Sequence, residues 1–148
     1  MKSLYPEATE ILVRFIDRLQ GAREITLPLD GNFPIRITQG EPVKTTEGEG
    51  CLFGIGLMYD TQKPAFQPLL KLIVIHKRVA KDKIAKVSAF PTFFSDDLDG
   101  IVEWSCTIRN GTIQHCIPRI QKSHARFIHR WLLQLVAMGY LNTNQSLT

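Results

Sequence analysis

The middle of the chain, residues 24–117, most constrains the fold because it reads as a succession of strands joined by turns. Cys51–Tyr59 alternates, which places its larger apolar residues on one face and its glycines on the other. Leu69–His76 is almost wholly apolar and predicts a central strand that is covered on both faces. Ile84–Phe94 predicts a further strand, bent or bulged at Pro91 because proline cannot donate to a strand ladder.

The clearest turn is Asn110-Gly111, which lies between two extended runs and predicts a two-residue hairpin. A regular register through this turn pairs Cys106 with His115. It also places Cys106 and Cys116 on opposite faces, so we expect no disulfide between them. The face expected to pack on the core carries Trp104, Cys106, Ile108, Ile113, His115 and Ile117.

Helical patterns flank the strands on both sides. Residues 4–20 repeat apolar residues at three- and four-residue steps and predict a helix, with Ser3 able to cap its start. A second, long helix is expected to begin between Pro118 and Ser123 and to end at about Leu141. Its expected apolar stripe consists of Ile120, His124, Phe127, Ile128, Trp131, Leu135 and Met138.

This order of elements predicts an α+β fold. We expect an N-terminal helix, a mostly antiparallel sheet of about six to eight strands built from hairpins, and a long C-terminal helix packed on the sheet. A chain of 148 residues is the size of one domain, so residues 1–148 are expected to form a single domain. The polar residues 143–148 are expected to form a frayed tail.

The sequence argues against a membrane or secreted protein. Its most apolar stretch, Trp131–Leu141, is interrupted by Gln134 and Gly139, and a bilayer needs roughly 20 apolar residues. Pro6 and Glu7 fall where a signal peptide would have its apolar centre. The three cysteines are odd in number and not closely spaced, which favours a reducing compartment. The expected location is therefore the cytoplasm.

Motifs for catalysis or metal binding are weak. Residues 96–100 are acidic, but a solvated turn explains them better than a calcium loop, since the final glutamate of such a loop is missing. The four histidines lack zinc spacing. Cys106 opposite His115 would resemble a nucleophile and base, but no third group orients them, so a core location is favoured. The sequence thus predicts no catalytic residue, cofactor or metal, and leans against an enzyme; an enzyme acting in a cleft between sheet and helix remains open.

Clusters of basic residues are the strongest indication of function in the sequence. The net charge is +4, but residues 1–103 hold 13 basic and 14 acidic side chains, whereas residues 104–148 hold five basic side chains and no acidic one. We name two groups as candidate anion-binding residues. The hairpin cluster is Lys77, Arg78, Lys81 and Lys83, and the helix cluster is Arg119, Lys122, Arg126 and Arg130.

Two functions follow from these features as hypotheses. The first is a small non-enzymatic binding module whose basic face meets an anionic partner such as DNA or RNA. The alternative is a protein–protein adaptor or a homodimer that uses its sheet and Phe93 or Phe94; the helix–sheet–helix order is similar to that of secretion-chaperone-like domains. Against the first hypothesis, acidic residues of a neighbouring turn could neutralise the basic face, and the candidates are Asp96, Asp97, Asp99 and Glu103.

Overall fold

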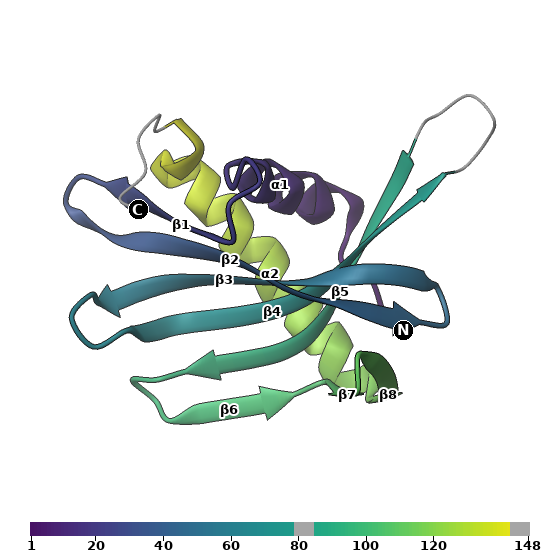
Figure 1. The fold of residues 1–148 in the computed structure, drawn as a ribbon. Helices are drawn as coiled ribbons and strands as arrows, with labels where there is room; N and C mark the ends of the chain where they lie inside the picture. Colours follow the sequence, from purple (N-terminus) through teal and green to yellow (C-terminus); the bar gives the residue numbers. More distant parts are fainter. Residues whose placement is uncertain (79–84, 143–148) are drawn as a thin grey trace.

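The computed structural model describes residues 1–78 and 85–142, and it is shown as a ribbon in Figure 1. The elements in chain order are α1 (Pro6–Asp17), β1 (Glu24–Leu29), β2 (Asn32–Thr45), β3 (Gly48–Asp60), β4 (Ala65–Arg78), β5 (Ala85–Asp96), β6 (Ile101–Trp104), β7 (Cys106–Arg109), β8 (Thr112–Cys116), α2 (Pro118–Met138) and a short 3₁₀ helix, η1 (Tyr140–Asn142). The residues expected to form a frayed tail, 143–148, lie outside the described part.

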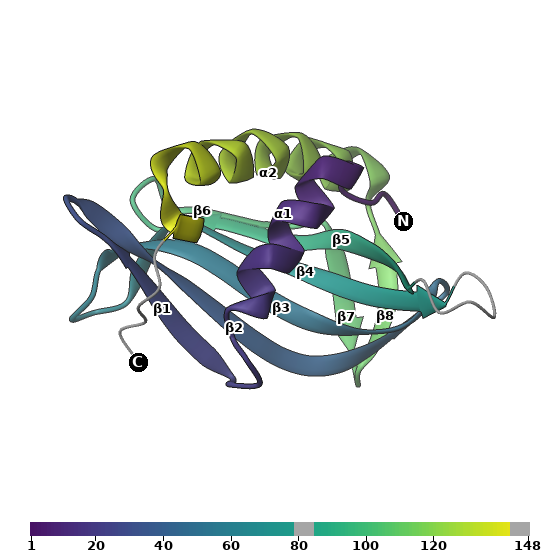
Figure 2. The ribbon, with the colours of Figure 1, turned by 90° about the horizontal axis from the view of Figure 1, so that it is seen from above.

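Eight strands form one sheet in the order β6-β5-β4-β3-β2-β8-β7, with β1 paired to β2. All neighbours are antiparallel except β2 and β8, which are parallel and meet at Lys44 and Thr112. Both helices lie on the same side of the strands, which curve beneath them (Figure 2). The predicted α+β fold is confirmed: an N-terminal helix, a mostly antiparallel sheet of hairpins and a long C-terminal helix packed on the sheet.

The main core lies between the sheet and the two helices. Strand alternation directs Ile35, Ile55 and Leu70 towards the helices, where all three are buried. Phe15 on α1 and Leu132 on α2 close this layer and are fully buried. The helices therefore supply the cover that the apolar face of the sheet requires.

The residues before and after α1 are tied to α2 or to the segment that follows α2. The backbone N–H of Lys2 donates to the Gln121 side-chain oxygen at 2.6 Å, and the Arg18 guanidinium donates to the Leu141 carbonyl. Gln121 is fully buried, and its amide nitrogen also donates to the Pro91 carbonyl at 2.9 Å. The first turn of α2 therefore joins the N-terminus to β5.

The other face of the sheet has a smaller apolar cluster, partly covered by the β7–β8 hairpin. Ser105 separates β6 from β7: its N–H donates to Thr92 on β5, and its carbonyl accepts from Ile117 at 2.7 Å. The chain thus leaves β5 and crosses to the end of β2, as the path of β7 and β8 below the sheet shows (Figure 2). The cluster consists of Val43, Ile73, Ile75 and Phe90, with Ile108 and Ile113 of the hairpin packed against it.

The expected register of this hairpin is wrong beyond its turn. Gln114 has no partner on β7, and this register shift places Cys106 opposite Cys116 rather than His115. The two cysteines form a disulfide, with Cα atoms 4.0 Å apart, which corrects the expectation that they lie on opposite faces. A single extra residue reverses which side every later residue faces. Trp104 and His115, which were expected on the core, are exposed.

The apolar stripe of α2 is also displaced from the expected one. Phe127 and Met138 are each 39% exposed, although both were expected to be buried. Gln121, Ala125 and Leu132, which the expected stripe did not include, are buried. The buried set is Gln121, His124, Ala125, Ile128, Trp131, Leu132 and Leu135.

Helix α1 starts at a proline, and helix α2 ends at a glycine. Helix α1 begins with Pro6 after Tyr5, and no side chain caps it, so the expected Ser3 cap is not formed. Helix α2 ends at Gly139, whose φ of 100° is a left-handed conformation that glycine adopts readily. Within residues 1–78 and 85–142, neither helix is long and apolar enough to cross a membrane.

Candidate anion-binding surface

The helix cluster lies along the outer side of α2. Arg119, Lys122, Arg126 and Arg130 are all exposed, and they follow one another at steps of three and four residues. Such steps keep side chains on one side of a helix. At 1.5 Å per residue, the row extends over roughly 16 Å. The structure therefore brings all four residues of this cluster onto one surface, as the sequence predicts.

Acidic residues of the neighbouring turn do not neutralise this row. Glu103 instead contacts His124, with Oε1 2.6 Å from the ring Nε2. Asp96 accepts hydrogen bonds from two backbone amides of its own turn, and Asp97 accepts one from the Phe66 amide at 2.7 Å. Among residues 1–78 and 85–142, no ion pair within 4.0 Å involves the helix cluster. No side chain of the row is therefore paired with a carboxylate of the described residues at this distance.

A hollow of about 410 Å³ is lined by two residues of this row, Arg126 and Arg130. The same hollow contains the hydroxyl of Ser123 and the amide of Gln134, which can also donate hydrogen bonds. Phe127, on its edge, is 39% exposed and offers an apolar surface. Two guanidinium groups one helical turn apart fit the oxygen atoms of a phosphate or carboxylate.

The start of α2 increases this positive character. The residue before the helix, Ile117, has no side-chain cap, and the first turn contains no acidic residue. Arg119 in that turn adds positive charge where the backbone dipole is already positive. This arrangement opposes helix stability and would be relieved by an anion bound nearby.

Of the hairpin cluster, Lys77 has a side chain within the described residues, and it is paired with Glu47 at 3.1 Å, which offsets its charge. Lys81, Lys83 and the side chain of Arg78 lie outside the described residues. The candidate surface that the described residues form is therefore the helix cluster.

The aromatic residues considered for a protein contact are both covered. Phe93 is 8% exposed and lies beneath Trp104, with ring centroids 4.4 Å apart. Phe94 faces the helices and packs against the rings of His124 and Phe127. The exposed aromatic at this edge is Trp104, at 49%, which the assumed hairpin register had placed in the core.

The two weaker chemical motifs also have structural explanations. Cys106 is bonded to Cys116, so the Cys106–His115 pair that the sequence register suggested is not formed. Across the described part of the chain, no group of three or more His, Cys, Asp or Glu side chains is arranged to hold a metal ion.

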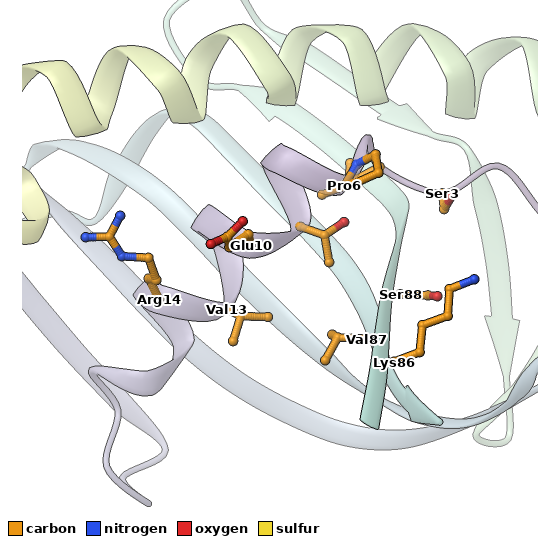
Figure 3. A pocket seen from close by; sticks show the side chains of 10 residues that line it. Ser3, Pro6, Glu10, Val13, Arg14, Lys86, Val87 and Ser88 are labelled. Carbon is orange, nitrogen blue, oxygen red and sulfur yellow. The ribbon is translucent and has the colours of Figure 1, made fainter. Parts of the chain in front are cut away.

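A second concave feature, which the sequence does not reveal, separates α1 from the first half of β5. It is an open groove of about 560 Å³ (Figure 3). Val13 on the helix and Val87 on the strand lie on its facing walls. These residues are far apart in sequence, so only the packing of α1 on the sheet brings them together.

No protein-family model matches this chain, and no curated protein or solved structure matches it at a significant level. The proposed function therefore depends on the chemistry of its own residues.

Proposed function

We propose that this protein is a small binding module that holds an anionic macromolecule against α2, with no reaction of its own. The observation that supports the proposal most directly is the uncompensated row of four basic side chains. Charge runs are usually balanced by nearby carboxylates on a solvated surface, but here Glu103 contacts His124, and Asp96 and Asp97 accept hydrogen bonds from backbone amides.

Nucleic acid is the anionic partner that this surface favours. Arginine guanidinium groups bind phosphate oxygens in pairs, and three of the four residues in the row are arginines. Phe127 lies beside Arg126 and is exposed enough for a base to stack on it. Stacking requires unpaired bases, so a single strand should bind more tightly than a duplex.

The test measures binding of a fluorescent single-stranded oligonucleotide by polarisation at several salt concentrations. The variant Lys122→Ala/Arg126→Ala/Arg130→Ala should bind more weakly, and its salt dependence should flatten by about 0.7 in log–log slope for each phosphate that it no longer neutralises. Arg109→Ala is the matched control, because Arg109 is an exposed arginine on the β7–β8 hairpin.

Phe127→Ala separates the two parts of the surface. It should lower the affinity for the single strand while leaving the salt slope unchanged, since no charge is removed. If the triple variant and Arg109→Ala behave alike, the affinity does not come from α2 and the proposal fails. Absence of binding by the wild-type protein at low salt would refute it as well.

Self-association through β6 is the second candidate function. This edge strand is exposed along its whole length, and it carries Ile101, Val102 and Trp104. Natural proteins usually protect an apolar edge of this kind, and one that is left open often pairs with another chain. Sedimentation of the wild-type protein and of Val102→Lys tests this: a dimer formed through β6 should become a monomer in the variant.

A further inference from the structure

The groove between α1 and β5 contains a length of sheet edge that no other part of the described chain covers. Strand β6 pairs only with the far half of β5, from Phe93 to Asp96. At Val87, in the near half, β5 has β4 on one side and the groove on the other, whereas two residues further on Leu4 covers the edge at Ala89. This half of β5 is therefore an edge strand beneath a helix.

The hydrogen bonds of β5 show which backbone groups face the groove. The Ala89 carbonyl accepts a bond from the Leu4 N–H at 2.8 Å, so Ala89 directs its polar groups away from β4. Residues two apart in a strand direct these groups to the same side. Because β4 and β5 pair without a shift between Ala85 and Phe90, the N–H and C=O of Val87 also point towards the groove.

Within residues 1–78 and 85–142, no hydrogen bond of the chain reaches those two groups of Val87. The N-terminal segment satisfies the edge at Ala89 through Leu4 and then turns away into α1. An extended segment entering the groove would continue the same pairing one step further along β5. The bond from Leu4 thus shows that this edge can accept a backbone N–H from another segment.

The walls of the groove define what side chain such a segment would carry. Val13 and Val87 face each other across it (Figure 3), and Leu4, which also lines it, is buried. An apolar side chain of moderate size would fill this space. On the helix side, Glu10 and Arg14 carry opposite charges one turn apart and largely offset each other.

The strand side of the groove carries a positive charge. Lys86 lines it and is exposed. A bound segment would therefore be favoured if the end that lies near Lys86 were acidic.

We propose that the groove between α1 and β5 binds an extended peptide of a partner protein, which adds a strand to β5 at Val87. The peptide places an apolar side chain between Val13 and Val87 and directs acidic residues towards Lys86. Main-chain hydrogen bonds to the strand edge supply affinity, and the apolar space supplies selectivity. This site is separate from the helix cluster and does not depend on nucleic-acid binding.

Amide exchange in the free protein is the first test. The Val87 amide should exchange rapidly, because its N–H faces the groove, whereas the neighbouring Ser88 amide should be protected by its bond to β4. Slow exchange at Val87 in the free protein would mean that the edge is already covered, and this result would overturn the proposal.

The second test selects binders from a displayed library of random short peptides and then measures the affinities of the selected peptides after synthesis. Val87→Pro removes the outward N–H without removing a bond to β4, and it should weaken binding about tenfold. Val87→Ala is the matched control, since it keeps the N–H and shortens the side chain. Bound peptide should slow exchange of the Val87 amide in the wild-type protein.

Val13→Trp keeps the test decisive if the proline variant unfolds. It fills the groove from the helix side and should abolish binding of the selected peptides, whereas Val13→Ala should retain it. Lys86→Glu should weaken binding of acidic peptides and strengthen binding of peptides whose acidic residues are replaced by lysine. Arg126→Ala/Arg130→Ala should leave peptide binding unchanged.

The proposal is overturned if no peptide is enriched on the wild-type protein over Val13→Trp. It is also overturned if the enriched peptides bind Val87→Pro and wild type equally, or if they lose affinity only in the α2 variant. The last result would assign them to the basic surface rather than to the strand edge.

Discussion

The basic row of α2 should cost the protein stability, and Arg119→Glu measures that cost. Arg119 lies in the first turn of the helix, where no side chain caps the backbone and no acidic residue is present. A positive side chain there opposes the helix dipole, whereas a negative one complements it. The substitution should therefore make the fold more stable.

The size of the gain follows from two changes at one position. Removing an unfavourable charge and adding a favourable one are each worth about 0.3–1 kcal/mol at a helix end. Because Arg119 is exposed, we take the lower part of this range, which gives about 1 kcal/mol in total. For a domain of this size, that gain raises the Tm by roughly 2–4 °C.

Thermal unfolding at low salt and in 0.5 M salt (about a 4 Å screening length) is the assay. The gain from Arg119→Glu should be largest at low salt and shrink as ions screen the interaction. Arg130→Glu is the matched control, since it makes the same charge change more than two turns further along the helix, where the dipole effect has faded.

The same variant should bind single-stranded nucleic acid less well than the wild-type protein, so stability and binding should move in opposite directions. Such opposition is common where residues are retained for function at the expense of stability. A loss of stability in Arg119→Glu, or a gain equal to that of Arg130→Glu and independent of salt, would refute this account of the helix start.

Three further outcomes are expected from the fold. Replacing Cys106 and Cys116 together with alanine should lower the free energy of unfolding by about 2–3 kcal/mol in urea, because the disulfide closes a loop with a sequence separation of 10. Gly50→Ala should lower the free energy of unfolding by about 1–3 kcal/mol, and with it the Tm, since a Cβ there would lie 2.6 Å from a backbone oxygen of β4. Gly40→Ala, where the nearest atom is 3.3 Å away, should be less destabilising. Burial raises the pKa of Tyr140 above its ordinary 10.0, so the unfolded chain ionises first and the free energy of unfolding should fall as the pH rises above 10, less steeply in Tyr140→Phe.

Each of these three predictions would be contradicted by a specific result. Equal urea midpoints for the oxidised and cysteine-free proteins would show that the disulfide constrains little. Similar melting temperatures for Gly40→Ala and Gly50→Ala would show that β4 can move away from β3 at no cost in stability. An unchanged alkaline slope in Tyr140→Phe would assign the pH dependence to other groups.

The fold was predictable because each element has a periodicity that the core requires. The alternation in Cys51–Tyr59 and the apolar run Leu69–His76 are the central strands of the sheet. The expected bulge beside Pro91 is confirmed, since the β4–β5 register shifts opposite Thr92. Periodicity reports which face is buried, so it predicts layers well.

The hairpin register was not predictable in the same way. A two-residue turn fixes the pairs next to it, but the extra residue Gln114 leaves no mark on the alternation. In a regular ladder Cys106 and Cys116 would lie on opposite faces, but the extra residue brings them together in a disulfide. Packing of the hairpin across the outer face decides the register, and that packing involves β2, which lies far away in the sequence.

The placement of the helix cluster was predictable in part. The helix period places Lys122, Arg126 and Arg130 on one side, but whether carboxylates reach them depends on how β6 lies beside α2. The groove could not be predicted at all, since Val13 and Val87 meet only after α1 has packed on the sheet.

Helix α2 follows all eight strands of the sheet in the chain. A nascent chain can pair its strands as they emerge, but the part of the apolar side that α2 covers stays exposed to water until α2 has been synthesised and has docked beside α1. Until then the chain is open to chaperones and proteases. Since α2 also carries the basic row, the protein cannot present that surface in its docked form before its core has closed.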